Sequence, residues 1–180
     1  MSMDFVEGLP KSHMQSVVLV VMVVVDRLTK YSHFRALSHP YTAAKVASVY
    51  LQYVFKLHGM PSTIVSDRDP IFNSYFWREL MRLQGVALTM PSSYHPQTHG
   101  QTEVVNKSLE HNLKAFATNK PTTWVEWLPL VEFWFNTNFH VAAKMTPFEA
   151  LYGYPPPRVL DYAVGTTRVG AVDLLLKGRQ

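Results

Sequence analysis

Acidic residues are scarce in this chain, and three of them stand where carboxylates could share a metal ion. The sequence has 13 Asp and Glu among 180 residues. Asp4 lies in the segment Ser2–Val6, and Asp67 directly follows the short segment 62–66, which is predicted to be a strand. Glu103 follows the polar stretch 91–100, and residues 68–102, 35 in all, separate it from Asp67. The spacing makes these three carboxylates candidates for one site.

Three carboxylates brought together repel one another unless a cation neutralises them. Oxygen ligands without His or Cys suit Mg²⁺ or Mn²⁺. Two such ions about 3.5–4 Å apart can activate an attacking oxygen and stabilise a leaving oxygen at a phosphodiester. A structural interpretation also stands: Asp4 could solvate a strand end, while Asp67 and Glu103 cap helices, as acids near helix N-termini often do. Spacing alone does not choose between the two.

The hydrophobic pattern predicts a mixed sheet flanked by helices, in the order β-β-β-α-β-α-β-α-α, with one more short helix after it. We expect strands at 2–6, 17–25, 33–37, 62–66 and 86–90, of which the second is β-branched and apolar on both faces. Helices are expected after the Thr42 cap, over 73–84, from Thr102, over 124–138, and after Thr146. If the first and fourth strands are neighbours, Asp4 and Asp67 lie side by side, and the helix from Thr102 can bring Glu103 to them.

Composition excludes several classes of protein. The chain has no Cys, which removes disulfides, thiolate catalysis and Cys-ligated zinc. The net charge of +4 permits an anionic partner without requiring one. The longest apolar run, Val17 to Val25, is about half of what a membrane-spanning helix needs, and the first ten residues lack a basic signal-peptide region. We therefore expect no membrane partner.

Several blocks of the sequence carry a resemblance to a known family. The chain resembles the catalytic core of retroviral-type integrases, most closely those of gypsy-type LTR retrotransposons. The blocks run in the family's order and are Ser2-Met3-Asp4-Phe5-Val6-Glu7-Gly8-Leu9-Pro10, Val23-Val24-Val25-Asp26-Arg27-Leu28-Thr29-Lys30, Ser66-Asp67-Arg68-Asp69-Pro70-Ile71-Phe72, His95-Pro96-Gln97-Thr98, Gly100-Gln101-Thr102-Glu103 and Met145-Thr146-Pro147-Phe148-Glu149-Ala150-Leu151-Tyr152-Gly153.

This resemblance implies an α/β, RNase H-like fold with a five-stranded mixed sheet, whose first three strands are antiparallel. It also implies that Asp4, Asp67 and Glu103 are the catalytic, metal-binding triad, with two Mg²⁺ or Mn²⁺ ions when DNA is bound. The family trims the 3′ ends of element DNA and then joins the freed 3′-OH to target DNA. Element-end DNA, target DNA and further copies of the chain are the implied partners, and the nucleus is the implied location.

Residues near the triad are candidates for DNA contact. Lys107 lies four residues after Glu103 on the same predicted helix face, with Asn106 and Lys114 nearby. A lysine there could hold a phosphate, although an intrahelical Glu–Lys pair is the structural alternative. Tyr94 could stack on a terminal base or simply anchor its loop. Two further candidates are Arg68, a cation beside Asp67, and His99, which stands where gypsy-type relatives usually carry Asp.

Other polar residues in the matched blocks are given structural roles. We expect Asp26 to open a turn after the second strand and Asp69 to serve as a turn or cap residue. His95 and His99 are four apart, but they fall in a segment predicted to be a loop, with no Cys or third His nearby, so zinc is not favoured. The aromatic cluster around Trp124 is expected in the core or at a subunit interface.

The domain boundaries follow from the same pattern. We expect the catalytic core at 1–157 and a linker or the start of a truncated C-terminal region at 158–180, with no upstream His/Cys zinc module because Cys is absent. The segment 12–26 is about three residues longer than in relatives, and an odd insertion in a strand swaps its faces unless a bulge absorbs it. Two alternatives remain: a decayed remnant that only binds nucleic acid or self-associates, and a nuclease of the same fold acting on RNA–DNA hybrids.

Overall fold

A computed structural model describes residues 1–10, 12, 19–90, 97–117, 121–141, 143–157, 167 and 170–171. Five strands form one mixed sheet in the order β3-β2-β1-β4-β5, where the strands are β1 (Ser2–Val6), β2 (Leu19–Val25), β3 (Ser32–Ser38), β4 (Thr63–Ser66) and β5 (Ala87–Thr89). The first three strands pair antiparallel, and β4 is parallel to both β1 and β5. The predicted α/β fold, with its antiparallel first three strands, is confirmed.

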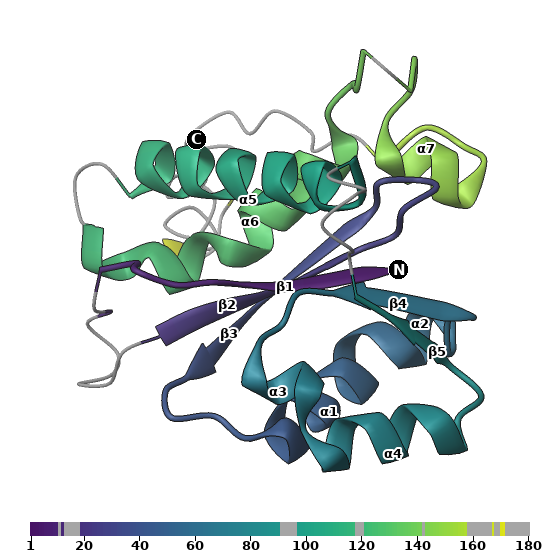
Figure 1. Cartoon of the computed structure of the whole chain (residues 1–180). Helices are drawn as coiled ribbons and strands as arrows, with labels where there is room; N and C mark the ends of the chain where they lie inside the picture. Colours follow the sequence, from purple (N-terminus) through teal and green to yellow (C-terminus); the bar gives the residue numbers. More distant parts are fainter. Residues whose placement is uncertain are drawn as a thin grey trace.

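Helices cover both faces of the sheet (Figure 1). One face carries α1 (Ala43–Tyr50), a π-helical segment (Leu51–Phe55), α2 (Lys56–His58), α3 (Pro70–Asn73) and α4 (Tyr75–Leu83). The other face carries α5 (Gln97–Phe116) and α6 (Trp124–Thr137), which a 3₁₀ turn (Pro121–Thr123) precedes. The short helix α7 (Pro147–Tyr152) follows α6. Each face therefore has its own hydrophobic core.

Strand β2 belongs to both cores because its side chains alternate between the two faces. Met22 and Val24 pack with α1 and α4, whereas Val21, Val23 and Val25 pack with α5 and α6. All seven residues of β2 are buried, which confirms the prediction of a central strand covered on both sides. Its register with β1 and β3 is continuous over residues 21–25 and 19–25, respectively, so no bulge interrupts the described part of this strand. Residues 13–18 lie outside the described part of the chain.

Most predicted caps are confirmed. The Thr42 hydroxyl accepts a hydrogen bond from the Lys45 amide at 3.2 Å and begins α1. At α7, Thr146 and Glu149 form a reciprocal capping box, with Pro147 in the first turn. The helix after Thr42 ends before Gly59, whose φ of 72° is accessible to glycine at little cost.

The helix predicted over 73–84 is present as α4, which begins after Ser74, an extended residue that caps it through the Trp77 amide at 3.2 Å. The short helix α3 before it was not predicted. One predicted boundary was wrong. The expected loop 91–100 ends earlier than predicted, because α5 begins at Gln97 and its first turn includes His99 and Gly100. A helix that packs over several turns tolerates the roughly 1 kcal/mol cost of one glycine.

Helix α6 covers the outer edge of β3, which is an edge strand of the sheet. The Asn136 side chain accepts a hydrogen bond from the Ser32 amide and donates one to the Ser32 carbonyl, both at 2.8 Å. One turn earlier, Glu132 accepts a hydrogen bond from the Phe34 amide at 2.8 Å. These side chains take the place of a neighbouring strand and satisfy edge groups that otherwise invite pairing with another chain.

We expect Asn136→Ala to destabilise the fold by about 1–3 kcal/mol, because it leaves buried backbone groups of Ser32 without partners. Chemical denaturation should show this as a lower midpoint with an unchanged slope. The matched control is Thr137→Ala on the same helix, since the Thr137 hydroxyl donates to the Phe133 and Trp134 carbonyls of its own helix. Equal losses in the two variants would contradict the role given to Asn136.

Candidate functional site

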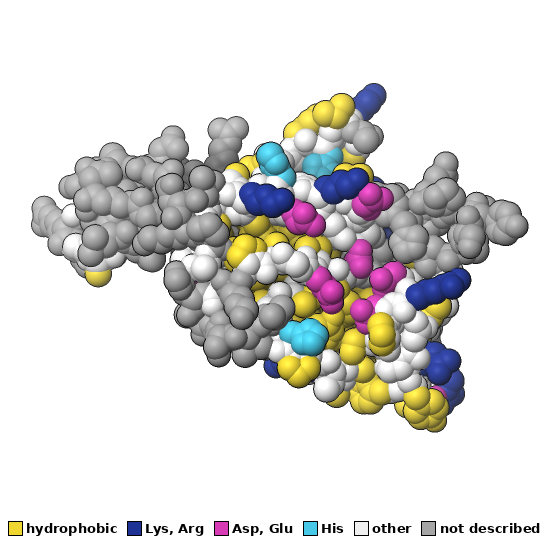
Figure 2. Space-filling view, turned by 60° about the vertical axis from the view of Figure 1, so that its left-hand side comes forward, with side chains coloured by type: hydrophobic (Ala, Val, Ile, Leu, Met, Phe, Trp, Pro, Cys, Tyr) yellow, Lys and Arg dark blue, Asp and Glu magenta, His cyan; other side chains and the backbone are white. Residues whose placement is uncertain are grey.

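The pairing of β1 with β4 places two of the predicted acids together. These strands are parallel, with Met3 opposite Ser66, and the next residue on each chain is Asp4 or Asp67. Because parallel strands end at the same edge of a sheet, both carboxylates lie on that side of the molecule. Figure 2 shows Asp and Glu side chains gathered in the middle of one face, with Lys, Arg and His side chains around them.

Helix α5 docks onto the same strand through two polar contacts. The Thr102 hydroxyl donates a hydrogen bond to the Ser2 hydroxyl at 3.0 Å, and both residues are buried. One turn later, the Asn106 amide donates to Asp4 Oδ2 at 2.8 Å. The other carboxylate oxygen of Asp4 accepts from the Phe5 amide, also at 2.8 Å. Asn106, predicted as a DNA contact, thus lies against the first carboxylate and orients it.

Glu103 lies on the same helix but forms a different contact. Its carboxylate pairs with Lys107 Nζ at 2.7 Å, and this contact raises the Lys107 pKa. The two side chains are 62% and 74% exposed, respectively. The pair is the structural alternative that the i, i+4 spacing allowed. Among the described residues, no group of three His, Asp or Glu side chains is close enough to hold a metal ion. The structure therefore brings Asp4 and Asp67 together without gathering the whole triad.

Two further acids lie near Asp4 and Asp67, and they give this edge an excess of negative charge. The Asp69 pKa is raised, first by burial and then by the charges of Asp67, Glu7 and Asp4. This acidic edge, defined by Asp4, Glu7, Asp67 and Asp69, is where a cation would relieve the most repulsion. Asp69 also caps α3 through the Ile71 amide at 2.7 Å, as predicted.

Tyr41 reaches the acidic edge from the other side of β1, and nothing in the sequence pattern marked it. Its ring packs against Phe5, with 5.1 Å between ring centroids. Burial, the charges of Asp69 and Glu7, and a hydrogen bond with Glu7 raise the Tyr41 pKa to about 12. The phenol is therefore neutral at physiological pH. Glu7 lies in the first block of the sequence that resembles integrases. It comes close to Asp69 only because β1 pairs with β4.

The remaining predicted residues are spread around this edge. Arg68 is exposed directly after Asp67, and Lys114 lines a hollow of about 210 Å³ with Glu7 and Glu110. The backbone of His99 is in the first turn of α5 rather than in a loop. Tyr94 and His95 lie outside the described residues. Asp26 has its predicted structural role, because it accepts hydrogen bonds from the Thr29 amide and hydroxyl at 3.2 and 2.6 Å.

The donor chemistry of Asp4, Asp67 and Glu103 fits a hard divalent cation. All three offer carboxylate oxygens, which Mg²⁺ and Mn²⁺ prefer. Burial first, and then the charges of Asp67, Glu7 and Asp4, raise the pKa of Asp69 beside the first two acids. Glu103 is exposed on the helix that holds Asn106 against Asp4, where it is paired with Lys107.

Sequence comparison finds relatives among retrotransposon polyproteins. The chain is 35% identical over 156 residues to the Transposon Tf2-3 polyprotein of Schizosaccharomyces pombe, and equally to the Tf2-4 polyprotein. The match covers 87% of this chain and 12% of either polyprotein, so the chain spans a small part of these relatives. No protein-family model matches the chain.

Comparison of structures finds integrases. A chain of the simian T-cell lymphotropic virus intasome, solved in complex with PP2A regulatory subunit B56 gamma, superposes with a TM-score of 0.72 at 18% identity, covering 93% of this chain and 59% of that one. The HTLV-2 integrase catalytic core domain, solved with magnesium in a trimeric form, gives 0.67 at 17% identity, covering 83% and 93%. The BIV integrase core gives 0.61 at 23% identity, covering 82% and 90%.

The superpositions on solved structures establish the fold. The match to the polyproteins shows, in addition, that the sequences are related. The chain is therefore related in sequence to one segment of the Tf2 retrotransposon polyproteins, and it shares its fold with the catalytic cores of retroviral integrases.

Proposed function

We propose that this chain is the catalytic core of a DNA integrase, a metal-dependent polynucleotidyl transferase that processes 3′ ends of retrotransposon DNA and joins them to host DNA. One observation carries the proposal. Asp4 and Asp67 are adjacent on the parallel pair β1 and β4, and α5 bonds to Asp4 through Asn106. Glu103, three residues before Asn106, is on the same helix and within one turn of that contact.

In this proposal, Asp4, Asp67 and Glu103 hold Mg²⁺ or Mn²⁺. The bound ion would supply a Lewis acid that polarises the phosphodiester and lowers the pKa of the attacking hydroxyl. Asn106 holds the Asp4 carboxylate in one orientation, so that less reorganisation is needed when the cation binds. Both chemical steps are substitutions at phosphorus. Water attacks when the 3′ end is processed, and the freed DNA 3′-OH attacks when that end is joined to target DNA.

Lys107 links DNA binding to this site. In the structure it neutralises Glu103, and a phosphate of the DNA would compete for the same ammonium group. When the phosphate takes Lys107, Glu103 is released to join Asp4 and Asp67. Arg68 and Lys114 add positive charge on either side of the acidic edge and would contact neighbouring phosphates. Tyr94 and His99 are proposed to contact the DNA end from the segment that precedes and begins α5.

Further copies of the chain are proposed as partners. The HTLV-2 integrase catalytic core domain was solved in trimeric and dimeric forms, which supports this proposal. Element-end DNA and target DNA are the nucleic-acid partners, and the reaction would take place in the nucleus. No described helix is both long and apolar enough to cross a membrane.

A second candidate function is favoured by the Glu103–Lys107 pair. If that pair persists when metal and DNA are present, the acidic edge offers two adjacent carboxylates and no third. The chain would then be a decayed integrase core that binds nucleic acid or self-associates without chemistry. Metal binding separates this candidate from the enzyme.

Mg²⁺ or Mn²⁺ should raise the melting temperature of the wild type, because ligands that bind only the folded state stabilise it by RT ln(1 + [L]/Kd), about 2.7 kcal/mol at 100 times Kd. Asp67→Asn should lose most of this shift. Glu79→Gln on α4 is the matched control, since Glu79 is on the opposite face and pairs with Arg82. If metal raises the melting temperature of Asp67→Asn as much as that of the wild type, Asp67 is not a metal ligand.

Strand transfer should be abolished by Glu103→Gln, because the amide keeps the shape of the side chain but is a far weaker ligand for a hard cation. The assay joins a labelled duplex with element-end sequence to a plasmid target and counts joined products. Circular dichroism of the variant should match the wild type, because Glu103 is on the surface. Joining by Glu103→Gln at the wild-type rate would refute the triad.

Lys107→Ala should weaken binding to duplex DNA and reduce the slope of log K against log salt by about 0.9, the value for one phosphate contact on B-DNA. It should not weaken the metal-induced melting shift, because its loss frees Glu103 from its pair. Fluorescence anisotropy at several salt concentrations measures the slope, with Lys45→Ala at the start of α1 as the control. If the slope of log K against log salt is the same in Lys107→Ala and the wild type, Lys107 does not contact a DNA phosphate.

A further inference from the structure

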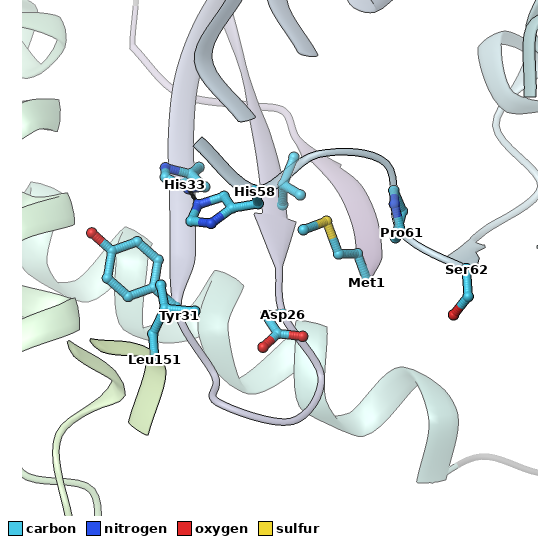
Figure 3. Close-up of a pocket in the computed structure, with 9 residues that line it drawn as sticks. Met1, Asp26, Tyr31, His33, His58, Pro61, Ser62 and Leu151 are labelled. Atoms are coloured by element: carbon cyan, nitrogen blue, oxygen red, sulfur yellow. Dashed lines mark hydrogen bonds between the residues drawn. The ribbon is translucent and has the colours of Figure 1, made fainter. Parts of the chain in front are cut away.

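A second set of titratable side chains lies at the other end of the sheet, beyond the start of β1 and β4. It borders a hollow of about 370 Å³, whose polar lining includes Asp26, Tyr31, His33, His58 and Ser62. Figure 3 shows the rings of His33 and His58 next to each other and Asp26 farther away at the turn. The proposed reaction uses none of these groups.

A chain of hydrogen bonds joins three elements at this place. Glu132 on α6 bonds to His33 Nδ1 at 3.1 Å, and His33 Nε2 on β3 bonds to His58 Nε2 on α2 at 2.8 Å. His33 is 3% exposed, so water does not substitute for these partners. Helix α2 is the last turn of the continuous helical segment that begins at Ala43, and none of its residues is buried, so the bond from His58 is a direct tie between this turn and β3.

The bond between the two rings depends on the number of protons they carry. A hydrogen bond between two Nε2 atoms needs one donor and one acceptor. One ring with a proton on Nε2 and one without satisfies this, whether or not His33 is an imidazolium beside Glu132. When both rings are imidazolium, both Nε2 atoms are donors and the two charges repel. The bond is therefore lost on double protonation.

The charged groups around the pair do not compensate for a second proton. The Glu132 carboxylate already accepts hydrogen bonds from Arg35 and from the Phe34 amide. Burial raises the Glu132 pKa, but His33, Arg35 and the Phe34 amide together outweigh it and lower the pKa. Asp26, the acid that acts on His58, is engaged by Thr29. The phenol of Tyr31, 6.0 Å from the His58 ring between centroids, has a raised pKa from burial and from Tyr152 on α7, so it stays neutral.

We propose that the His33–His58 pair is a proton-sensitive latch that holds α2 against β3 and opens when both rings are protonated. Residues 59–62 connect α2 directly to β4, and β4 leads to Asp67. The latch thus controls how firmly the beginning of the strand that carries Asp67 is held. The inference does not depend on the proposed function, because it concerns the attachment of α2 alone.

The direction of the pH dependence follows from His58. Burial, followed by the positive charge of His33, lowers its pKa below 6.5 in the folded chain. A histidine with a lowered pKa stabilises the closed state fully above about pH 6.5 and loses that contribution as the pH falls below it. Amide hydrogen exchange, corrected for the intrinsic rate, should show protection of residues 56–66 falling between pH 7.5 and pH 5.5, while 19–25 stays protected.

His58→Gln should remove this pH dependence, because an amide can donate or accept toward His33 and has no proton to gain. His111→Gln, at an exposed position on α5, should behave as the wild type. Equal pH-dependent loss in the wild type and His58→Gln would overturn the latch. Undiminished protection of 56–66 in the wild type at pH 5.5 would overturn it without any variant. A Zn²⁺-induced rise in melting temperature that His58→Gln abolishes would instead assign the pair to a metal ion.

Discussion

The parallel pairing of β1 with β4 is the contact on which the candidate site depends. These strands are adjacent at the centre of the sheet, although 56 residues (7–62) separate them in sequence. Only this pairing makes Asp4 and Asp67 neighbours, and it also brings Glu7 and Asp69 close enough to act on each other. Because both faces of the sheet are covered by helices, the site is confined to the sheet edge, where polar groups reach solvent.

Negative charge at that edge is balanced locally and incompletely. Asp4 is held by hydrogen bonds from Asn106 and the Phe5 amide, and Glu103 by Lys107, whereas Asp69 keeps a raised pKa. A surface ion pair such as Glu103–Lys107 is weak in water and is readily exchanged for a stronger partner. In the proposed function, the same residues form a stable surface in the free protein and a binding site once a cation and a phosphate are present.

Buried polar contacts at the far side of the sheet have a different role. Asn136 and Glu132 satisfy the edge of β3, and Glu132 also anchors His33 and, through it, His58. Buried polar groups that are fully hydrogen-bonded fix one arrangement of the elements, because any other arrangement leaves them without partners. Helix α6 therefore stabilises β3 and α2 together, away from the acidic edge.

The sequence by itself determined much of this protein. The β-branched run at 17–25 predicted a strand buried on both faces, and Thr42 and Thr146 predicted helix starts, because these signals are local. The candidate acids, the resemblance to integrases and the structural roles of Asp26 and Asp69 also came from the residues alone. The short helix α3 and the early start of α5 did not, because Pro70 and the Pro- and Gly-containing stretch 91–100 are local signals for a turn or loop.

Tertiary structure decided what each side chain meets. Helical spacing put Asn106, Glu103 and Lys107 near one another, but only the docking of α5 on β1 directed Asn106 to Asp4, while Glu103 turned to Lys107. Tyr41, His33 and His58 joined their clusters through contacts between distant segments, which no local pattern encodes. The physical reason is that periodicity restricts a residue to a face of its element, whereas the pairing of strands and the packing of helices determine what that face contacts.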